Sequence, residues 1–148
     1  MEQMDILAAC REKDNFSKML GVEIVELKPG FARGRMPLTP QHYNCFGIVH
    51  AGAIFTLADT TFGAAVNFHQ GRLSPTVSMN CQFLKAGRGQ VLTAVATESS
   101  PGPKLASYNV EVRDESGDVV AVFQCMAYRK KATLEELFAT KAREANQA

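Results

Sequence analysis

The chain has 148 residues, 46% of them hydrophobic, which is enough for one domain whose core needs neither disulfides nor a metal. Its 16 Lys and Arg balance 15 Asp and Glu, so the formal charge of +1 argues against a nucleic-acid surface or strong attraction to anionic lipid. The four cysteines form no Cys-x-x-Cys pair, and we interpret them as reduced core residues: Cys10, Cys45, Cys81 and Cys125.

The N-terminus lacks the basic and apolar regions of a secretory signal. The most apolar segment, residues 51–68, contains Asp59 and two glycines, which is atypical of a membrane-spanning helix. No repeat or linker divides the sequence. We therefore expect a cytoplasmic protein that does not enter a membrane and forms a single domain over residues 1–148.

Helices and a hairpin are predicted in the first part of the chain. Apolar residues recur at mostly helical spacing from about residue 4 to residue 20, which predicts one or two short helices. Residues 22–27 and 31–36 flank the turn dipeptide Pro29-Gly30, so we expect a hairpin of two strands.

The second part begins with a helix over residues 51–68, which is apolar on nearly all its faces. Segments with strand character follow it, separated by Gly-rich, Pro-rich or Asp-rich turns. These predicted strands lie near residues 75–84, 90–99, 104–113 and 119–129. In the last two, large apolar residues alternate with smaller or more polar ones, as an antiparallel sheet with one buried face requires.

A C-terminal helix is predicted over about residues 133–146. Thr133 and Glu136 have the spacing of a capping box, which marks a helix start. An apolar stripe follows, formed by Leu134, Leu137, Phe138 and Ala142. We expect this helix to dock on the protein or on a partner subunit.

The order of these elements predicts the fold class. Strands and helices do not alternate, so a parallel sheet is not expected, and the class is α+β. A helix that is apolar on nearly every side must be surrounded. The sequence therefore predicts an antiparallel sheet wrapped around the long central helix.

Asp59 is the one charged residue in the segment 51–68. Removing a carboxylate from water without a partner is costly, so such a residue is normally capped, paired or used. We interpret Asp59 as a functional residue. The alternative is a structural carboxylate held by backbone groups or by the hydroxyl of Thr60 or Thr61.

Residues 44–59, Asn-Cys-Phe-Gly-Ile-Val-His-Ala-Gly-Ala-Ile-Phe-Thr-Leu-Ala-Asp, resemble the Asn-x5-His-Gly-Gly-x6-Asp signature of PaaI-like hotdog-fold acyl-CoA thioesterases. The resemblance covers about residues 16–131, including the segment 83–89 and the hairpin 104–130. It implies a hotdog fold and the hydrolysis of an acyl-CoA to free acid and CoA. Coenzyme A is then part of the substrate, and no cofactor or metal is expected.

By this resemblance, Asp59 is the general base or the nucleophile, and Asn44 positions the thioester or the water. The N–H groups of Ala51 and Gly52 form the oxyanion hole, with His50 as an orienting group or further donor. The family has Gly where this chain has Ala51, which keeps the N–H but loses room and access to positive φ. Structural alternatives stay open, because Asn44 can shape a turn and His50 can cap a helix.

The resemblance also implies that each site is shared, with the Asp from one subunit and the Asn and helix N-terminus from the other. We therefore expect a homodimer at minimum and a homotetramer as the full assembly. A hydroxyl near the start of the strand after the helix often assists in such families. Thr76 is the best match here, and Ser78 is its competitor.

Lys85, Arg88 and Lys104 lie beside glycine or proline turns and are candidates to meet the phosphates of coenzyme A. Their alternative is a solvated surface position. The acyl group is expected to be aryl or of medium length. The candidate residues for its pocket are Phe46, Phe55, Phe62 and Met79. The alternative is that these residues only pack in the hydrophobic core.

Two other functions are considered. A hotdog hydratase or dehydratase acting on an enoyl thioester would need a His facing the β-carbon, whereas His50 lies at the helix start. A non-catalytic acyl-CoA binding module would bind without turnover, and the presence of both Asn44 and Asp59 argues against it.

Overall fold

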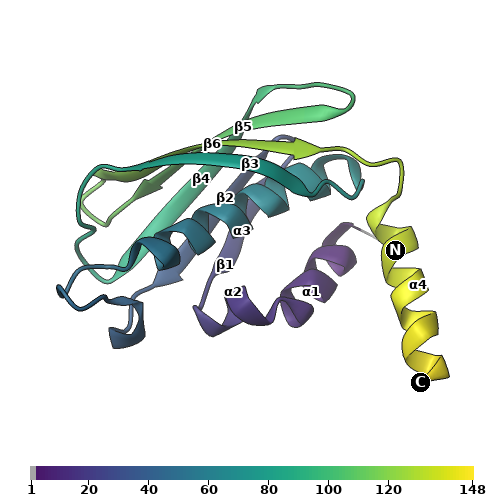
Figure 1. Ribbon diagram of the computed structural model, residues 1–148, viewed down its shortest axis with the longest axis horizontal. Helices are drawn as coiled ribbons and strands as arrows, with labels where there is room; N and C mark the ends of the chain where they lie inside the picture. Colours follow the sequence, from purple (N-terminus) through teal and green to yellow (C-terminus); the bar gives the residue numbers. More distant parts are fainter. Residues whose placement is uncertain (1–2) are drawn as a thin grey trace.

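A computed structural model describes residues 3–148. One six-stranded antiparallel sheet curves around the long helix α3, and the N-terminal helices lie on the side of α3 away from the sheet (Figure 1). The predicted α+β class, with a sheet wrapped around a central helix, is confirmed. The elements are α1 (Gln3–Lys13), α2 (Asn15–Met19), β1 (Glu23–Lys28), β2 (Phe31–Pro37), the 3-10 helix η1 (Pro40–His42), α3 (Ala51–Gln70), β3 (Thr76–Phe83), β4 (Val91–Ser100), β5 (Leu105–Arg113), β6 (Val119–Tyr128) and α4 (Leu134–Gln147).

The strand order is β1-β2-β4-β5-β6-β3, so β1 and β3 are the two edges. Every neighbouring pair is antiparallel. Small, fully buried side chains line the inner face of the sheet: Ala32, Ala94, Ala96, Ala106, Ala121 and Ala127. These residues let α3 lie close to the strands, which fixes its position along the sheet.

The contact between β2 and α3 is especially close at Gly34. A Cβ atom at this position would lie 2.2 Å from Oγ1 of Thr61, which is fully buried on α3. The Thr61 hydroxyl donates to the carbonyl oxygen of Leu57 at 2.7 Å. Gly34 is therefore needed for space, because any larger residue would push the helix from the sheet.

The predicted N-terminal helical region divides at Asp14. The backbone N–H and the hydroxyl of Ser17 donate to its carboxylate at 3.1 and 2.8 Å, which caps the start of α2. The central helix extends slightly beyond the predicted end, to Gln70. Gly71 ends it with a φ of 64°, a left-handed conformation that glycine adopts without strain.

The capping box of α4 is present as predicted. Thr133 N–H donates to the carboxylate of Glu136 at 2.9 Å, and Glu136 N–H donates to the Thr133 hydroxyl at 3.1 Å. Leu134 is buried, and Phe138 is partly buried against the core. Ala142 is exposed, so only the first turns of this helix dock on the protein.

All four cysteines have free thiols, but the prediction that they are core residues is only partly right. Cys125 is buried, Cys10 and Cys81 are half-buried, and Cys45 is exposed. Cys45 lies in the loop before α3, where a turn places it in solvent although the Phe46 that follows it is apolar.

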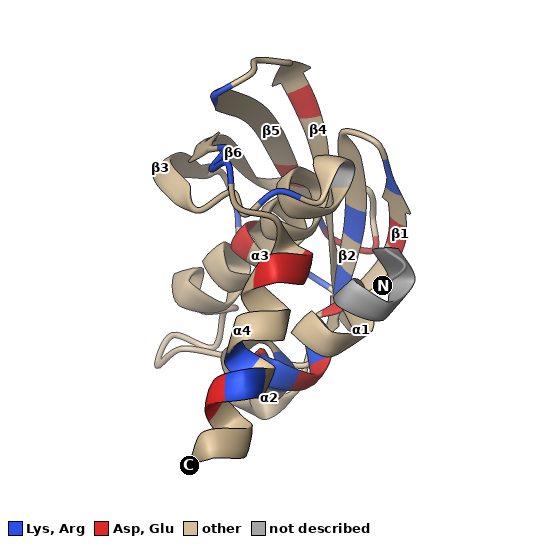
Figure 2. Cartoon of the chain, turned by 90° about the vertical axis from the view of Figure 1, so that its right-hand side faces the viewer, with Lys and Arg blue, Asp and Glu red and all other residues tan. Residues whose placement is uncertain are grey.

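Residues of both charges are interspersed over the helices and strands (Figure 2). Within residues 3–148, none of the helices is long and apolar enough to span a lipid bilayer.

Candidate active site

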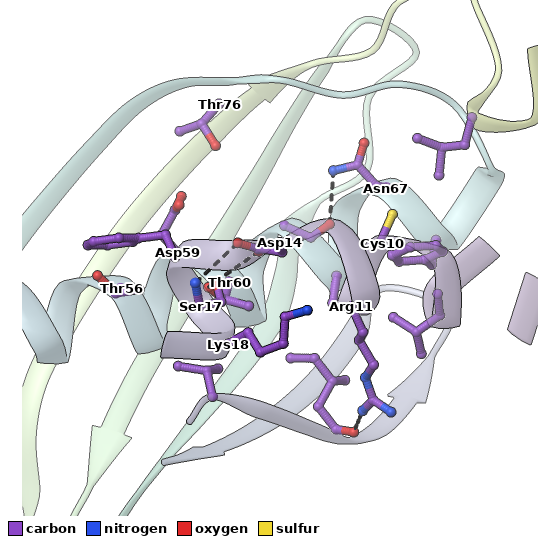
Figure 3. A pocket seen from close by; sticks show the side chains of 18 of the residues that line it. Cys10, Arg11, Asp14, Ser17, Lys18, Thr56, Asp59, Thr60, Asn67 and Thr76 are labelled. Carbon is purple, nitrogen blue, oxygen red and sulfur yellow. Dashed lines mark hydrogen bonds between the residues drawn. The ribbon is translucent and has the colours of Figure 1, made fainter. Parts of the chain in front are cut away.

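Asp59 lies in the middle of α3, on the face that points away from the inner surface of the sheet, and it is half-buried. It lines a cavity of about 1070 Å³ that also receives residues from α1, α2, β1, α4 and the start of β3. Figure 3 shows its carboxylate directed toward Thr76, with Asp14, Ser17 and Thr60 beside it. The cavity provides a space in which a substrate can reach Asp59, as the functional interpretation of this residue requires.

The pKa of Asp59 is raised above its ordinary value. Burial is the largest cause, and the negative charge of Asp14 acts in the same direction. The hydroxyl of Thr76 acts in the opposite direction, because a hydrogen bond to the carboxylate favours the ionised form. Asp59 is therefore a stronger proton acceptor than an exposed carboxylate, as a general base requires.

The two hydroxyls suggested as structural partners of Asp59 bind elsewhere. Thr61 donates to the carbonyl of Leu57, and Thr60 Oγ1 lies 2.7 Å from Ser17 Oγ. This second hydrogen bond ties α2 to α3 beside the carboxylate. Neither threonine hydroxyl therefore holds the Asp59 carboxylate, whose hydroxyl partner is Thr76.

The two candidate hydroxyls, those of Thr76 and Ser78, differ in their position relative to the cavity. Thr76 is the first residue of β3 and lines the cavity opposite Asp59, whereas Ser78 does not line the cavity. Cys125 on β6 is also close, since the charge of Asp59 helps burial to raise the pKa of this thiol to about 12. A thiol with such a pKa is not a nucleophile at neutral pH.

Asn44 and His50 have structural hydrogen bonds within the protomer. Asn44 Oδ1 accepts from the N–H groups of Phe46 at 2.9 Å and Ile48 at 3.3 Å, and so shapes the loop before α3. His50 is the N-cap of α3, and its Nδ1 accepts from the N–H of Gly52 at 2.8 Å. Because Nδ1 accepts, a neutral His50 ring carries its proton on Nε2.

Ala51 is the first residue of α3 and is exposed. Its φ is not positive, so the replacement of the family's glycine introduces no backbone strain. Its N–H finds no acceptor within the part of the chain that the structure describes, as is typical of a first-turn amide. This amide is therefore free to bind an oxyanion, and the helix dipole adds partial positive charge there.

The thioesterase superfamily model matches residues 46–121, slightly more than half of the chain. The acyl-coenzyme A thioesterase PaaI of Escherichia coli strain K12 is 33% identical over 127 residues, which cover 85% of this chain and 90% of that protein. The chain belongs to the thioesterase superfamily.

Solved structures agree with this assignment. The PaaI protein from the phenylacetic acid degradation operon of Escherichia coli superimposes with a TM-score of 0.82 and 30% identity, covering 88% of this chain and 95% of that one. A variant of the phenylacetic acid degradation protein PaaI from Thermus thermophilus superimposes with a TM-score of 0.74 and 30% identity, covering 79% of this chain and 100% of that one. This thioesterase therefore has the predicted hotdog fold.

A single protomer of the thioesterase does not bring all the predicted site residues together. Asp59 follows Ala51 by eight residues of continuous helix. At a rise of about 1.5 Å per residue, the two are separated by about 12 Å along the helix axis. The carboxylate and the helix N-terminus consequently lie too far apart to act on one carbonyl group.

The three basic residues considered for the phosphates of coenzyme A lie in two separate places in the thioesterase. Lys85 pairs with Asp118, and the backbone N–H of Arg88 donates to Asp114 at 3.2 Å, which places both near the end of β5. Lys104 directly precedes β5, whose nine residues separate it from the other two. At about 3.3 Å per residue this distance is about 30 Å, so the three do not form one phosphate site in a protomer.

Of the four proposed pocket residues, only Phe55 lines the cavity. Phe62 is fully buried in the core, where its ring meets Tyr108 edge to face. Met79 is partly buried against the core, and Phe46 is 83% exposed on the loop before α3. Periodicity could not separate Phe55 from Phe62, because the cavity face and the core face of α3 are both apolar.

Asp14 and Ser17 were not predicted as site residues. They come close to Asp59 only because α2 packs on α3, a contact between segments more than 40 residues apart in the sequence. The one local signal was the spacing Asp14-x-x-Ser17, which is typical of a helix N-cap.

Proposed function

We propose that this thioesterase hydrolyses acyl-CoA thioesters to a free acid and CoA, with Asp59 as the general base or nucleophile. The observation that carries the proposal is a half-buried carboxylate with a raised pKa, opposite Thr76, in a cavity of about 1070 Å³. The Escherichia coli relative that bears the name acyl-coenzyme A thioesterase supports the choice of thioester. Coenzyme A is part of the substrate, and the proposed reaction uses no cofactor.

In the proposed reaction, Asp59 either takes a proton from water as that water attacks the carbonyl carbon, or attacks this carbon itself. Negative charge then develops on the carbonyl oxygen. The free N–H of Ala51, at the positive end of α3, is the first donor for this oxygen. Collapse of the intermediate breaks the carbon–sulfur bond. On the general-base route, the CoA thiolate takes up the proton that Asp59 removed from water, and the free acid is formed. On the nucleophilic route, the acyl group remains on Asp59 as a mixed anhydride, which water then hydrolyses to the free acid, and the proton released passes to the thiolate.

His50 and Gly52 support the same oxyanion site. The His50 ring accepts the Gly52 N–H through Nδ1, which leaves the proton of Nε2 directed elsewhere. We propose that His50 holds the first turn of α3 in place and offers Nε2–H as a further donor. Asn44, with its Oδ1 engaged in the loop, retains its side-chain NH₂ to position the thioester or water.

The proposed site requires two protomers. The separation of about 12 Å along α3 prevents one chain from supplying both Asp59 and the oxyanion donors. Strand β3 is an open sheet edge with apolar side chains in solvent, Val77 being 55% and Phe83 46% exposed. Such an edge is typically covered by a partner. We propose a homodimer as the smallest active form and a homotetramer as the complete assembly.

The phosphates of coenzyme A are assigned to Lys85 and Arg88, which lie together in the turn after β3. Lys104, at the other end of β5, can contribute only to a different site, such as one formed with another subunit. For the acyl group, the aromatic ring of Phe55 and the apolar walls of the cavity favour an aryl or medium-length group.

The test is release of free thiol from short, medium, long and aromatic acyl-CoAs by wild type and Asp59→Asn. We expect turnover of at least one of them, and a loss of at least about 10²-fold in kcat for Asp59→Asn. The amide is similar in shape to the carboxylate, so acyl-CoA binding should persist. Binding by both proteins without thiol release would favour the binding module instead. An enoyl-CoA is added to the panel, and loss of its absorbance without thiol release would favour the hydratase.

A further inference from the structure

Gly63 follows Asp59 by four residues on α3, so the two share one row of the helix with Phe55. All three line the cavity. Glycine in the interior of a helix is less favourable than alanine, because it loses more backbone freedom on folding. The φ of Gly63 is not positive, so the backbone itself does not require a glycine here.

Close packing does not explain this glycine either. A Cβ atom at Gly63 would meet nothing within 4 Å beyond the backbone of its own helix, in contrast to Gly34, where the Thr61 hydroxyl lies at 2.2 Å. The added atom would project into the open cavity. Because the Cα–Cβ bond in a helix tilts toward the N-terminus, a longer side chain would extend toward Asp59.

The cavity continues past Gly63 as a largely apolar chamber. Its walls beyond this point include Ala64, Phe68, Leu73, Leu134, Leu137 and Phe138. Asn67 is the polar side chain of α3 in this region, and its amide is already bonded to Gly63 O at 2.9 Å and to Ser74 N–H at 2.8 Å. The stretch of α3 from Asp59 to Phe68 is about 13 Å long at about 1.5 Å per residue.

We propose that Gly63 determines acyl specificity, because its missing side chain opens the chamber between Asp59 and α4 to acyl groups of medium length or with an aromatic ring. This inference rests on the proposed function. Short acyl groups bind beside Asp59 without entering the chamber, so they depend on Gly63 less than longer acyl groups do. The first turns of α4 close the far end, which gives this C-terminal helix a part in specificity.

The test compares kcat/KM for acetyl-, octanoyl- and benzoyl-CoA in wild type, Gly63→Ala and Gly63→Leu. Gln70→Leu is the matched control, since it places the same side chain on the same helix at an exposed position outside the cavity. For Gly63→Leu we expect the ratio of octanoyl- to acetyl-CoA kcat/KM to fall about 10-fold or more, and the benzoyl ratio to fall with it. Gln70→Leu should leave both ratios unchanged.

Gly63→Ala keeps the test independent of folding. Alanine favours the helix, so the midpoint of thermal unfolding should rise by about 2–4 °C while the octanoyl to acetyl ratio falls. Equal losses for all three substrates, or unchanged ratios in both Gly63 variants, would overturn the inference while wild-type turnover upholds the proposed function. Absence of thiol release by wild type from every acyl-CoA would instead overturn the proposed function, and the inference with it.

Discussion

At the scale of the residue, two neighbours of Asp59 have opposite effects on its pKa. The charge of Asp14 raises its pKa in addition to burial, and the hydroxyl of Thr76 lowers it. Asp14 is itself held by the backbone N–H and hydroxyl of Ser17, and Ser17 in turn meets Thr60. The protonation of the proposed base therefore depends on how α2 and β3 are placed against α3.

This arrangement predicts opposite pH shifts in two variants. As a base or nucleophile, Asp59 must be ionised, so kcat/KM rises with pH through its pKa. Asp14→Asn removes a charge that raises this pKa, so the acid limb should move to lower pH. Thr76→Val removes the hydroxyl that lowers it, so the acid limb should move to higher pH. The measurement is the pH profile of kcat/KM for both variants.

Asn keeps a side-chain oxygen for the cap of α2, so Asp14→Asn should retain the fold. The control is Glu111→Gln, which removes an equal charge from the exposed outer face of β5 and should leave the profile unchanged. Shifts of Asp14→Asn and Thr76→Val in the same direction would contradict the assignment of Asp59 as the titrating group.

At the scale of the element, the position of α3 on the sheet depends on small residues, most strictly on Gly34. In Gly34→Ala the new Cβ would lie 2.2 Å from the Thr61 hydroxyl oxygen, which is a clash. Its distance from the Thr61 Cβ would be 3.4 Å, which is not a clash. We expect this variant to lower the free energy of unfolding by about 1–3 kcal/mol. Adding Thr61→Ala removes the clashing oxygen and leaves an ordinary contact.

The double variant should therefore be more stable than the sum of the two single effects predicts. Denaturant unfolding of the four proteins gives the coupling energy, expected at about 0.5–3 kcal/mol in favour of the double variant. Strict additivity would show that the helix moves aside without cost, and that the contact does not fix its position.

At the scale of the whole molecule, the proposed active site is divided between protomers. Asn44 and the start of α3 lie at one end of the helix and Asp59 at its middle, which one chain cannot bring together. The exposed apolar side chains of β3 and the 83% exposed Phe46 lie on elements adjoining these residues. In the proposed dimer, a single association covers these side chains and completes the site.

Subunit complementation tests this division. Asp59→Asn and Asn44→Asp should each be inactive, and the second keeps the Oδ1 acceptor on which the loop before α3 depends. After subunits exchange in an equal mixture, half of the dimers are mixed and each has one intact site. Thiol release should then recover to about a quarter of the wild-type rate.

Light scattering on the same samples provides the control, because both variants must remain dimers. If exchange is demonstrated and the mixture is no more active than its components, each protomer contains its whole site, and the division proposed from the length of α3 is wrong.

The sequence by itself determined the order of the main elements and the α+β class, and it singled out Asp59 as the candidate catalytic residue. These features depend on local rules: apolar periodicity, glycine and proline turns, the capping box of α4 and a single charge in an apolar segment. The helical and strand boundaries agree within a few residues for this reason. The motif from Asn44 to Asp59 also indicated the thioesterase family, which the comparisons establish.

Only the tertiary structure decided what surrounds Asp59. Asp14 and the chamber beyond Gly63 reach it through contacts between segments distant in the sequence, which no local pattern encodes. The family resemblance offered both Thr76 and Ser78, and the packing of β3 decided that Thr76 lies opposite Asp59. The same packing placed Lys104 at the opposite end of β5 from Lys85 and buried Phe62 in the core. Residue types can indicate which chemistry is possible, but the packing of α2, α3, α4 and β3 decides which side chains share one space.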